Sequence, residues 1–319
     1  MKLYKVIRKP PFFLSASHWI TKKDSPVKSN LKSRKAVIIP LVLMQYGSLK
    51  TKLASMRYIR PAIFISVKEM RKSAKGLTQN PHSGRKQIDR ATLNELENYA
   101  KSLGVSKIGY TKVKPDHIFD KFEILYDNAM ILLMEMDRKA IKSSPSKAAT
   151  KEIWRTYSEL GIIVNKIADF LRQQGINCHA SPAIGGDVCT IPVAENSGVG
   201  AVGKNGLLIT PEFGSSHRIA AVFIDVDNLP LKSLADNQHL WIKEFCETCN
   251  HCVKKCPGEA IYMHTRILED GYPQFIDREK CALPFSKNCC SCIKECPFIH
   301  GNYEKIKKKF DLPHKNQRI

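Results

Sequence analysis

The sequence predicts an α/β (α+β) domain followed by a small cysteine-rich module. Between residues 91 and 240, apolar runs typical of strands alternate with longer amphipathic stretches typical of helices. After residue 240 the composition changes to Cys, Lys and Pro, with short elements. We therefore expect four segments. A basic N-terminal extension covers 1–90, an α/β domain 91–240, a cysteine-rich module 241–300 and a basic tail 301–319.

Helices are predicted from apolar residues at helical spacing. This spacing is found between residues 92 and 103, and Gly104 is a typical helix end. Residues 152–175 form a longer amphipathic stretch that also ends at a glycine. Upstream, residues 59–70 predict a strand or a short helix packed on the core, and residues 75–87 predict a turn-rich linker.

Strands are predicted from short apolar runs. Residues 128–136 have the composition of a buried strand, and residues 207–210 and 218–226 predict two more. Within the cysteine-rich module, residues 261–277 predict a hairpin that turns at an Asp-Gly pair, residues 270–271.

The positive charge is concentrated at the two ends of the sequence. Residues 1–90 carry a net charge of +18 and residues 301–319 a net charge of +4, whereas residues 91–300 carry −1. Such an extension is suited to an acidic partner, an anionic membrane surface or RNA, or is simply solvated. Because there is no Arg-Arg pair and no apolar run of about 18 residues, we expect a cytoplasmic protein.

Four cysteines are crowded into FCETCNHCVKKCPGEAI, residues 245–261. Cys246, Cys249, Cys252 and Cys256 have spacings of two, two and three residues, and a proline follows. This is the bacterial ferredoxin pattern for a [4Fe–4S] cluster, in which the fourth cysteine binds a different cluster from the first three. Proline fits the start of a helical turn there, because its missing N–H would be unsatisfied anyway.

A second group of cysteines lies downstream and should exchange its last ligand with the first group. Cys289, Cys292 and Cys296 precede another proline, and Cys281 lies eight positions before Cys289. The exchange predicts one cluster on Cys246, Cys249, Cys252 and Cys296, and a second cluster on Cys256, Cys281, Cys289 and Cys292. Cys290 would be a spare neighbour or would replace Cys289.

A pair of zinc sites is the alternative use of these cysteines. Zinc usually takes two C-x2-4-C pairs separated by a longer spacer. The third closely spaced cysteine and the two Cys-Pro pairs favour iron–sulfur clusters instead. In a chain of 11 cysteines with no signal peptide, ligation is also favoured over disulfides.

Two segments flank the first group of cysteines, and together these segments resemble the reductive dehalogenase family. They are SGVGAVGKNGLLITPEFGSSHRIAAVFIDV at 197–226 and FIDREKCALPFSKNCCSCIKECPF at 275–298. The related epoxyqueuosine reductases share the Gly-Lys-Asn and the first cysteine run. The resemblance covers about residues 90–300. It implies a nitroreductase-like α/β domain that binds cobalamin (a corrinoid), followed by a two-cluster ferredoxin-like module that supplies electrons to reduce a carbon–halogen bond or an epoxide.

The resemblance also implies candidate site residues. Dehalogenases use a tyrosine as proton donor with a Lys or Arg beside it, for which Tyr157 and Lys204 are the candidates. Tyr157 is equally interpretable as a packing residue and Lys204 as a surface lysine. Asp187 is a weaker candidate, for the acid of epoxyqueuosine reductases. Four residues of the glycine-rich stretch would face the corrinoid, namely Gly198, Gly200, Gly203 and Asn205.

These observations predict an iron–sulfur oxidoreductase that passes electrons through two [4Fe–4S] clusters to a corrinoid or substrate site. One alternative is a non-catalytic two-cluster electron-transfer protein, and another is an enzyme resembling tRNA epoxyqueuosine reductase. The expected partner is an electron donor such as ferredoxin or flavodoxin. Neither the substrate nor the oligomeric state follows from the sequence.

Overall fold

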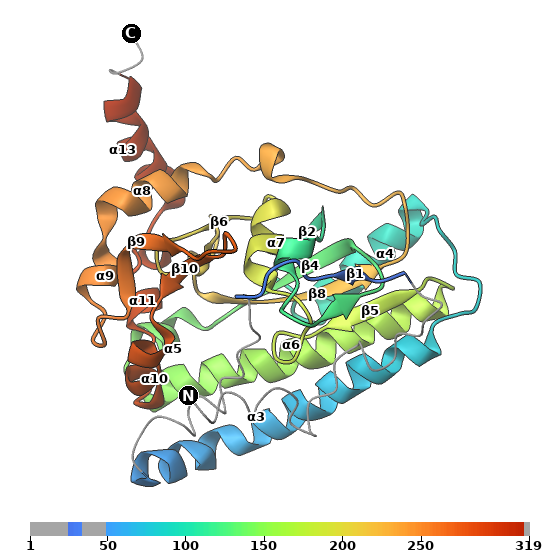
Figure 1. The fold of residues 1–319 in the computed structure, drawn as a ribbon, viewed down its shortest axis with the longest axis horizontal. Coiled ribbons are helices and arrows are strands. Elements are labelled where there is room, and N and C mark those ends of the chain that lie inside the picture. Colours follow the sequence, from blue (N-terminus) through green and yellow to red (C-terminus); the bar gives the residue numbers. More distant parts are fainter. Residues whose placement is uncertain (1–24, 34–48, 316–319) are drawn as a thin grey trace.

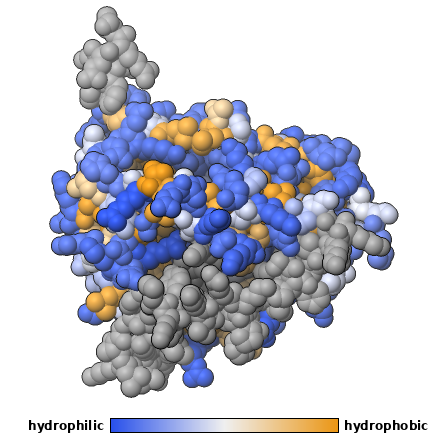
Figure 2. Space-filling view, viewed as in Figure 1, coloured by the Kyte–Doolittle hydropathy of each residue, from blue (hydrophilic) through white to orange (hydrophobic). Residues whose placement is uncertain are grey.

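The computed structural model of the protein describes residues 25–33 and 49–315 (Figure 1). The greater part of the predicted N-terminal extension before residue 49, and the last four residues of the predicted tail, lie outside the described residues. Within the described ranges, no helix is long and apolar enough to cross a membrane. In Figure 2 the visible surface is mainly hydrophilic, with apolar groups scattered over it.

A four-stranded sheet forms the centre of the larger domain. It consists of β2 (Lys107–Lys112), β4 (Asn128–Glu135), β8 (His217–Ile224) and β5 (Cys178–Ser181), in the order β2-β4-β8-β5. Every neighbouring pair is antiparallel. The strands predicted at 128–136 and 218–226 are the two central strands, β4 and β8. Strands and helices alternate along the chain as expected, and the result is a mixed α/β domain with an antiparallel sheet.

Helices cover both faces of this sheet. On one face, Leu132 of β4 and Val222 of β8 pack with the helices α4 (Arg90–Ser102) and α6 (Lys147–Gln173) in one hydrophobic core. On the other face, Ile131 and Phe223 pack with α7 (Thr190–Asn196) in a second core. Both central strands are buried on both sides, which explains why their sequences are almost continuously apolar.

The helices of this domain differ from their predicted bounds mainly at their starts. α4 ends before Gly104, whose φ of +101° favours glycine, as expected. α6 begins several residues before the predicted 152, because Ser146 caps it by accepting a hydrogen bond from the Ala149 amide. The stretch 59–70 is neither a strand nor a short helix, since it belongs to the 28-residue helix α3 (Leu49–Gly76), which runs beside α6 (Figure 1).

The cysteine-rich module consists of short helices around one hairpin. The hairpin pairs β9 (Ile261–Ile267) with β10 (Pro273–Ile276), as predicted for 261–277, and Gly271 in its turn has a φ of +81°. The helices are α8 (Trp241–Cys249), α9 (His251–Lys254), α10 (Arg278–Ser286), α11 (Ser291–Lys294) and α12 (Pro297–His300). The helix α13 (Tyr303–Lys315) follows and projects from this end of the molecule (Figure 1).

Smaller elements connect these parts. The strand predicted at 207–210 is β7 (Leu208–Ile209), which pairs with β6 (Ala201–Val202) in a separate hairpin. The remaining elements are β1 (Val27–Lys28), β3 (Glu123–Ile124), α5 (Arg138–Lys142) and the 3-10 turns η2 (Leu77–Gln79), η3 (Pro115–His117) and η4 (Leu234–Asp236).

Candidate metal centre

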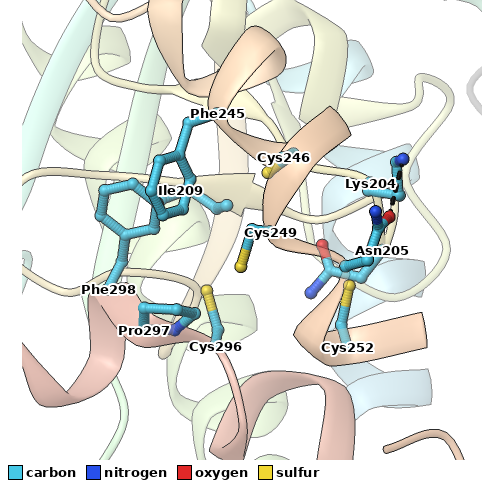
Figure 3. A pocket seen from close by; sticks show the side chains of 11 residues that line it. Lys204, Asn205, Ile209, Phe245, Cys246, Cys249, Cys252, Cys296, Pro297 and Phe298 are labelled. Atoms are coloured by element: carbon cyan, nitrogen blue, oxygen red, sulfur yellow. Dashed lines mark hydrogen bonds between the residues drawn. The ribbon is translucent and has the colours of Figure 1, made fainter. Parts of the chain in front are cut away.

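The first cysteine run lies on two helices that meet at a sharp turn. Cys246 and Cys249 are in α8, and Cys252 is in α9. Between the two helices, Asn250 adopts a left-handed conformation with a φ of 51°, which asparagine tolerates better than most residues. This turn brings Cys252 back towards the side of the helix on which Cys246 and Cys249 lie (Figure 3).

Cys296 comes from the far end of the module to the same place. It directly precedes α12, whose first residue is Pro297, the position in a helix where proline is best tolerated. The four cysteines of the first predicted set line one cavity, together with the apolar side chains of Ile209, Phe245 and Phe298 (Figure 3). Among the described residues, no group of three His, Cys, Asp or Glu side chains is placed to hold a single metal ion.

The chemistry of this donor set fits an iron–sulfur cluster. The pKa of Cys246 is raised to about 11, mainly by burial and to a smaller extent by the neighbouring Cys252 and Cys249. Burial likewise raises the pKa of Cys296 to about 12. Without a cation these thiols hold their protons, whereas iron stabilises the thiolates that ligate it. All the cysteines in this cavity are free of disulfides.

The four cysteines of the second predicted set are also neighbours. The pKa of Cys281, in α10, is raised to about 11 by burial and then by the charges of Cys256 and Cys289. The pKa of Cys292 is raised well above its ordinary value by burial and by the charges of Cys281, Cys290 and Cys289. Backbone amides already point at two of these sulfurs, since Ala260 donates to Cys256 and Ser291 to Cys289. The ligand role of both sets stays a prediction.

The two adjacent cysteines at 289 and 290 have different surroundings. The Cys290 thiol is buried in the hydrophobic cluster around Trp154 and lies 3.8 Å from the carbonyl oxygen of Ile141, to which it donates. The Cys289 sulfur lies instead in its own loop, 3.3 Å from the Ser291 hydroxyl. Both residues are near Cys292, but these contacts favour Cys289 as the ligand.

Lys204 ties the β6–β7 hairpin to the first cysteine run. Its ammonium lies 2.8 Å from a carboxylate oxygen of Glu247 and 2.9 Å from the side-chain oxygen of Asn250. The Lys204 side chain is only 2 % exposed, so it is not the surface lysine that the sequence left open. The next residue, Asn205, donates a hydrogen bond to the carbonyl oxygen of Cys292. The β6–β7 hairpin therefore makes hydrogen bonds to both of the segments that carry the two groups of cysteines.

The glycines predicted to face a corrinoid pack against the chain itself. A Cβ at Gly200 would lie 2.3 Å from the carbonyl oxygen of Ile209, and one at Gly203 would lie 2.6 Å from the Ile209 side chain. Gly198 has a φ of +73° in the turn after α7. Close packing of the β6–β7 hairpin thus accounts for Gly200 and Gly203 without a cofactor. The corrinoid contact of these residues stays a prediction that their contacts do not support.

Tyr157 and Lys204, the two candidates for proton transfer, have different partners. Tyr157 is on α6 and nearly buried, and the guanidinium carbon of Arg218 lies 3.7 Å from the centre of its ring. Trp154 packs against the same ring. The cation beside Tyr157 is therefore Arg218, which no pattern in the sequence had indicated. Arg218 is on β8, and only the packing of β8 on α6 brings it to the tyrosine.

Asp187 is in a loop on the α7 side of the sheet. One of its carboxylate oxygens lies 3.4 Å from Nε2 of His179 on β5, and both side chains are buried. Burial lowers the pKa of His179 to about 3, so the imidazole is neutral and the contact is not an ion pair. Asp187 and Tyr157 therefore lie on opposite faces of the sheet.

The chain is similar in sequence to two kinds of known reductase. No protein-family profile matches it. Over 209 residues it is 32 % identical to the tetrachloroethene reductive dehalogenase of Desulfitobacterium hafniense, which covers 60 % of this chain and 36 % of that protein. The chain thus spans about a third of the length of the dehalogenases it matches. Over 258 residues it is 24 % identical to the epoxyqueuosine reductase of Listeria monocytogenes, with 66 % of each chain covered.

Among solved structures, the chain is similar to the catabolic reductive dehalogenase NpRdhA. The TM-score is 0.67 at 16 % identity, and the match covers 92 % of this chain and 45 % of that one. At this identity the match shows a shared fold. Sequence and fold together confirm the resemblance to the superfamily of reductive dehalogenases and epoxyqueuosine reductases. The tetrachloroethene reductive dehalogenase of Dehalobacter restrictus, at 31 % identity over 210 residues, supports the same assignment.

Proposed function

We propose that the protein is an iron–sulfur oxidoreductase of the reductive dehalogenase-like type, which passes single electrons through two [4Fe–4S] clusters. The observation that carries this proposal is the meeting of Cys296 with Cys246, Cys249 and Cys252 around one cavity. Along the chain, a hairpin and two helices separate Cys296 from the other three cysteines. The matching of dehalogenases and epoxyqueuosine reductases by sequence supports the same assignment.

The site that receives the electrons would lie beside Tyr157. The loop that carries Cys290 and Cys292 packs in the same hydrophobic cluster as Tyr157 and Trp154. Arg218 over the ring places a positive charge beside the tyrosine, where a cation and an aromatic ring attract each other. A bound corrinoid would supply low-valent cobalt for reducing a carbon–halogen or carbon–oxygen bond. Because the predicted corrinoid face is occupied by the chain's own contacts, we derive no step through that group.

Metal content after anaerobic purification and reconstitution tests this proposal. We expect about eight irons per chain, corresponding to two clusters, and electron paramagnetic resonance signals of reduced [4Fe–4S] clusters after dithionite treatment. Addition of cobalamin, followed by gel filtration and cobalt analysis, then distinguishes a corrinoid enzyme from a protein that only transfers electrons. Retained cobalt supports a corrinoid enzyme, whereas eight irons without cobalt leave a two-cluster electron-transfer protein. Zinc in place of iron would overturn the proposal.

The crossed ligand sets are tested by a matched pair of substitutions. We expect Cys296→Ser to remove the cluster held by Cys246, Cys249 and Cys252 and to lower the iron content by about half. Cys290→Ser removes a neighbouring thiol that points into the apolar core, so its iron content should remain that of the unchanged protein. Loss of the other cluster in Cys296→Ser, or equal losses in both variants, would contradict the crossed assignment.

A tRNA-modifying reductase is the second candidate. The sequence similarity to epoxyqueuosine reductase covers 66 % of the chain, and residues 1–90 carry a net charge of +18 that suits a phosphate backbone. Binding of tRNA to the full chain should then weaken steeply with added salt. Deletion of residues 1–48, which precede α3, should reduce both the affinity and its salt dependence. Unchanged binding after the deletion would remove the N-terminal segment as an RNA contact.

A further inference from the structure

A group of five aromatic side chains connects the helix α13 to the cysteine cavity. Tyr303 and Phe310 of α13 lie 5.3 and 5.4 Å from Trp241, measured between ring centres. Trp241 in turn packs on Phe245 and Phe298. These last two rings are themselves 5.2 Å apart and line the cavity of the first cysteine set (Figure 3). These packed rings therefore lie between the inner face of α13 and that cavity.

The outer face of α13 is rich in lysine. Lys305, Lys308 and Lys309 are exposed, and Lys307 is half-buried. Glu304 and Asp311 are the only acids of the helix, so its residues 303–312 carry a net charge of +2. Leu312, on the same helix, is 59 % exposed. A cationic surface with an exposed apolar group suits the docking of a negatively charged protein, because complementary charge steers the encounter.

The two sets of cysteines lie on different sides of the module. Cys246 and Cys296 belong to the apolar cluster that contains Tyr303 and Trp241, on the α13 side. Cys292 packs against the cluster that contains Tyr157, on the side of the sheet domain. The first set is thus next to the lysine-rich helix, and the second is next to the proposed electron-receiving site.

We propose that the outer face of α13 is the docking surface for an acidic one-electron donor protein of the flavodoxin class, and that the Cys246 cluster is the first to accept its electrons. This inference rests on the proposed function. In the transfer, the anionic flavin hydroquinone of the donor is oxidised to the neutral semiquinone, and one [4Fe–4S]²⁺ cluster is reduced to [4Fe–4S]⁺. One electron moves, and no bond or proton is exchanged.

The test uses the reconstituted full chain and the hydroquinone of a bacterial flavodoxin in a stopped-flow instrument. The variant Lys305→Glu/Lys309→Glu reverses two exposed charges one helical turn apart. We expect its second-order rate of semiquinone formation at low ionic strength to fall about tenfold or more, and the difference to shrink as salt screens the charges. The milder Lys305→Gln/Lys309→Gln should lie between this variant and the unchanged protein.

Arg90→Glu/Lys166→Glu is the matched control, with the same change of charge at two exposed positions on α4 and α6. It should react with flavodoxin at nearly the rate of the unchanged protein. Equal slowing by the control, or no slowing in the α13 variants, would overturn the docking surface. Dithionite needs no docking surface, so it should reduce the clusters of every variant to the same extent. If dithionite reduces no cluster in the unchanged protein, the proposed function fails instead.

Discussion

The sheet domain and the cysteine-rich module are stabilised in different ways. In the sheet domain, two continuous apolar cores lie on either side of strands that are almost completely buried. In the module, the helices α9, α11 and α12 have four residues each, which is too short to be stable alone. Its apolar residues Met263, Ile267 and Leu283 are largely exposed. The sheet domain therefore depends on side-chain packing, and we predict that the module depends in addition on what its cysteines bind.

Removal of iron should produce the largest difference in stability between the sheet domain and the module. Without the clusters, we expect the backbone amides of residues 241–300 to exchange hydrogen at rates approaching those of an unfolded chain, because buried thiols and short helices cannot hold the module. The strands β4 and β8 should stay protected. Hydrogen exchange read by mass spectrometry, on chelator-treated and reconstituted protein, measures both. Equal protection of the module in the two samples would show that packing alone holds it.

A core substitution should have its effect in the sheet domain. Leu132 of β4 is fully buried against the α4 and α6 face, so Leu132→Ala should lower the free energy of unfolding by about 3 kcal/mol. Met263→Ala, in the β9–β10 hairpin, removes a side chain that is 46 % exposed and should cost less than about 0.5 kcal/mol. Guanidinium unfolding followed by circular dichroism compares the two. Similar losses would refute the contrast between the regions.

The contact between the regions can be tested through Lys204. Lys204→Met removes a buried cation beside the first cysteine cavity and leaves Glu247 unpaired. Since a reduced cluster carries one more negative charge, its reduction potential should fall by some tens of millivolts, on the order of a tenfold change in the equilibrium. A potentiometric titration followed by electron paramagnetic resonance measures the shift.

Lys243→Met is the matched control for this effect. Lys243 is half-exposed and pairs with Glu195, so water already screens much of its charge. Its loss should move the potential less than the loss of Lys204 does. A larger shift in Lys243→Met would show that the buried ammonium is not the main electrostatic influence on that cluster.

Local patterns in the sequence were sufficient to predict those elements of the fold that are formed by neighbouring residues. The unbroken apolar run of β4 and the Asp-Gly turn of the β9–β10 hairpin both identify their elements. The ferredoxin spacing also predicted a grouping of Cys296 with Cys246, and the two side chains line one cavity, although their role as ligands stays a prediction. β5, with the sequence CHAS, has no periodic pattern in its four residues and was not predicted.

Features that depend on tertiary packing were beyond the sequence. The length of α3 is one example, since its lysines and arginines interrupt the pattern of apolar residues that would otherwise indicate one long helix. The partner of Tyr157 is another, because Arg218 reaches it only through the register of β8 in the sheet. The role of Lys204 in proton transfer stays a prediction, and its contact with Glu247 follows from the position of α8, which the sequence did not reveal.

The proposed crossing of the two ligand sets would have a consequence for biosynthesis. A ribosome makes Cys246, Cys249 and Cys252 first, yet the cysteine that completes their set, Cys296, is made last of all the proposed ligands. The other set is complete four residues earlier, at Cys292. With these ligand sets, the cluster that gains its first ligands earliest would be the last to gain its fourth. In a chain that ends before Cys296, iron and sulfide would find three thiols of this set and no fourth, so we expect the Cys246 cluster to be completed only after Cys296 has been made.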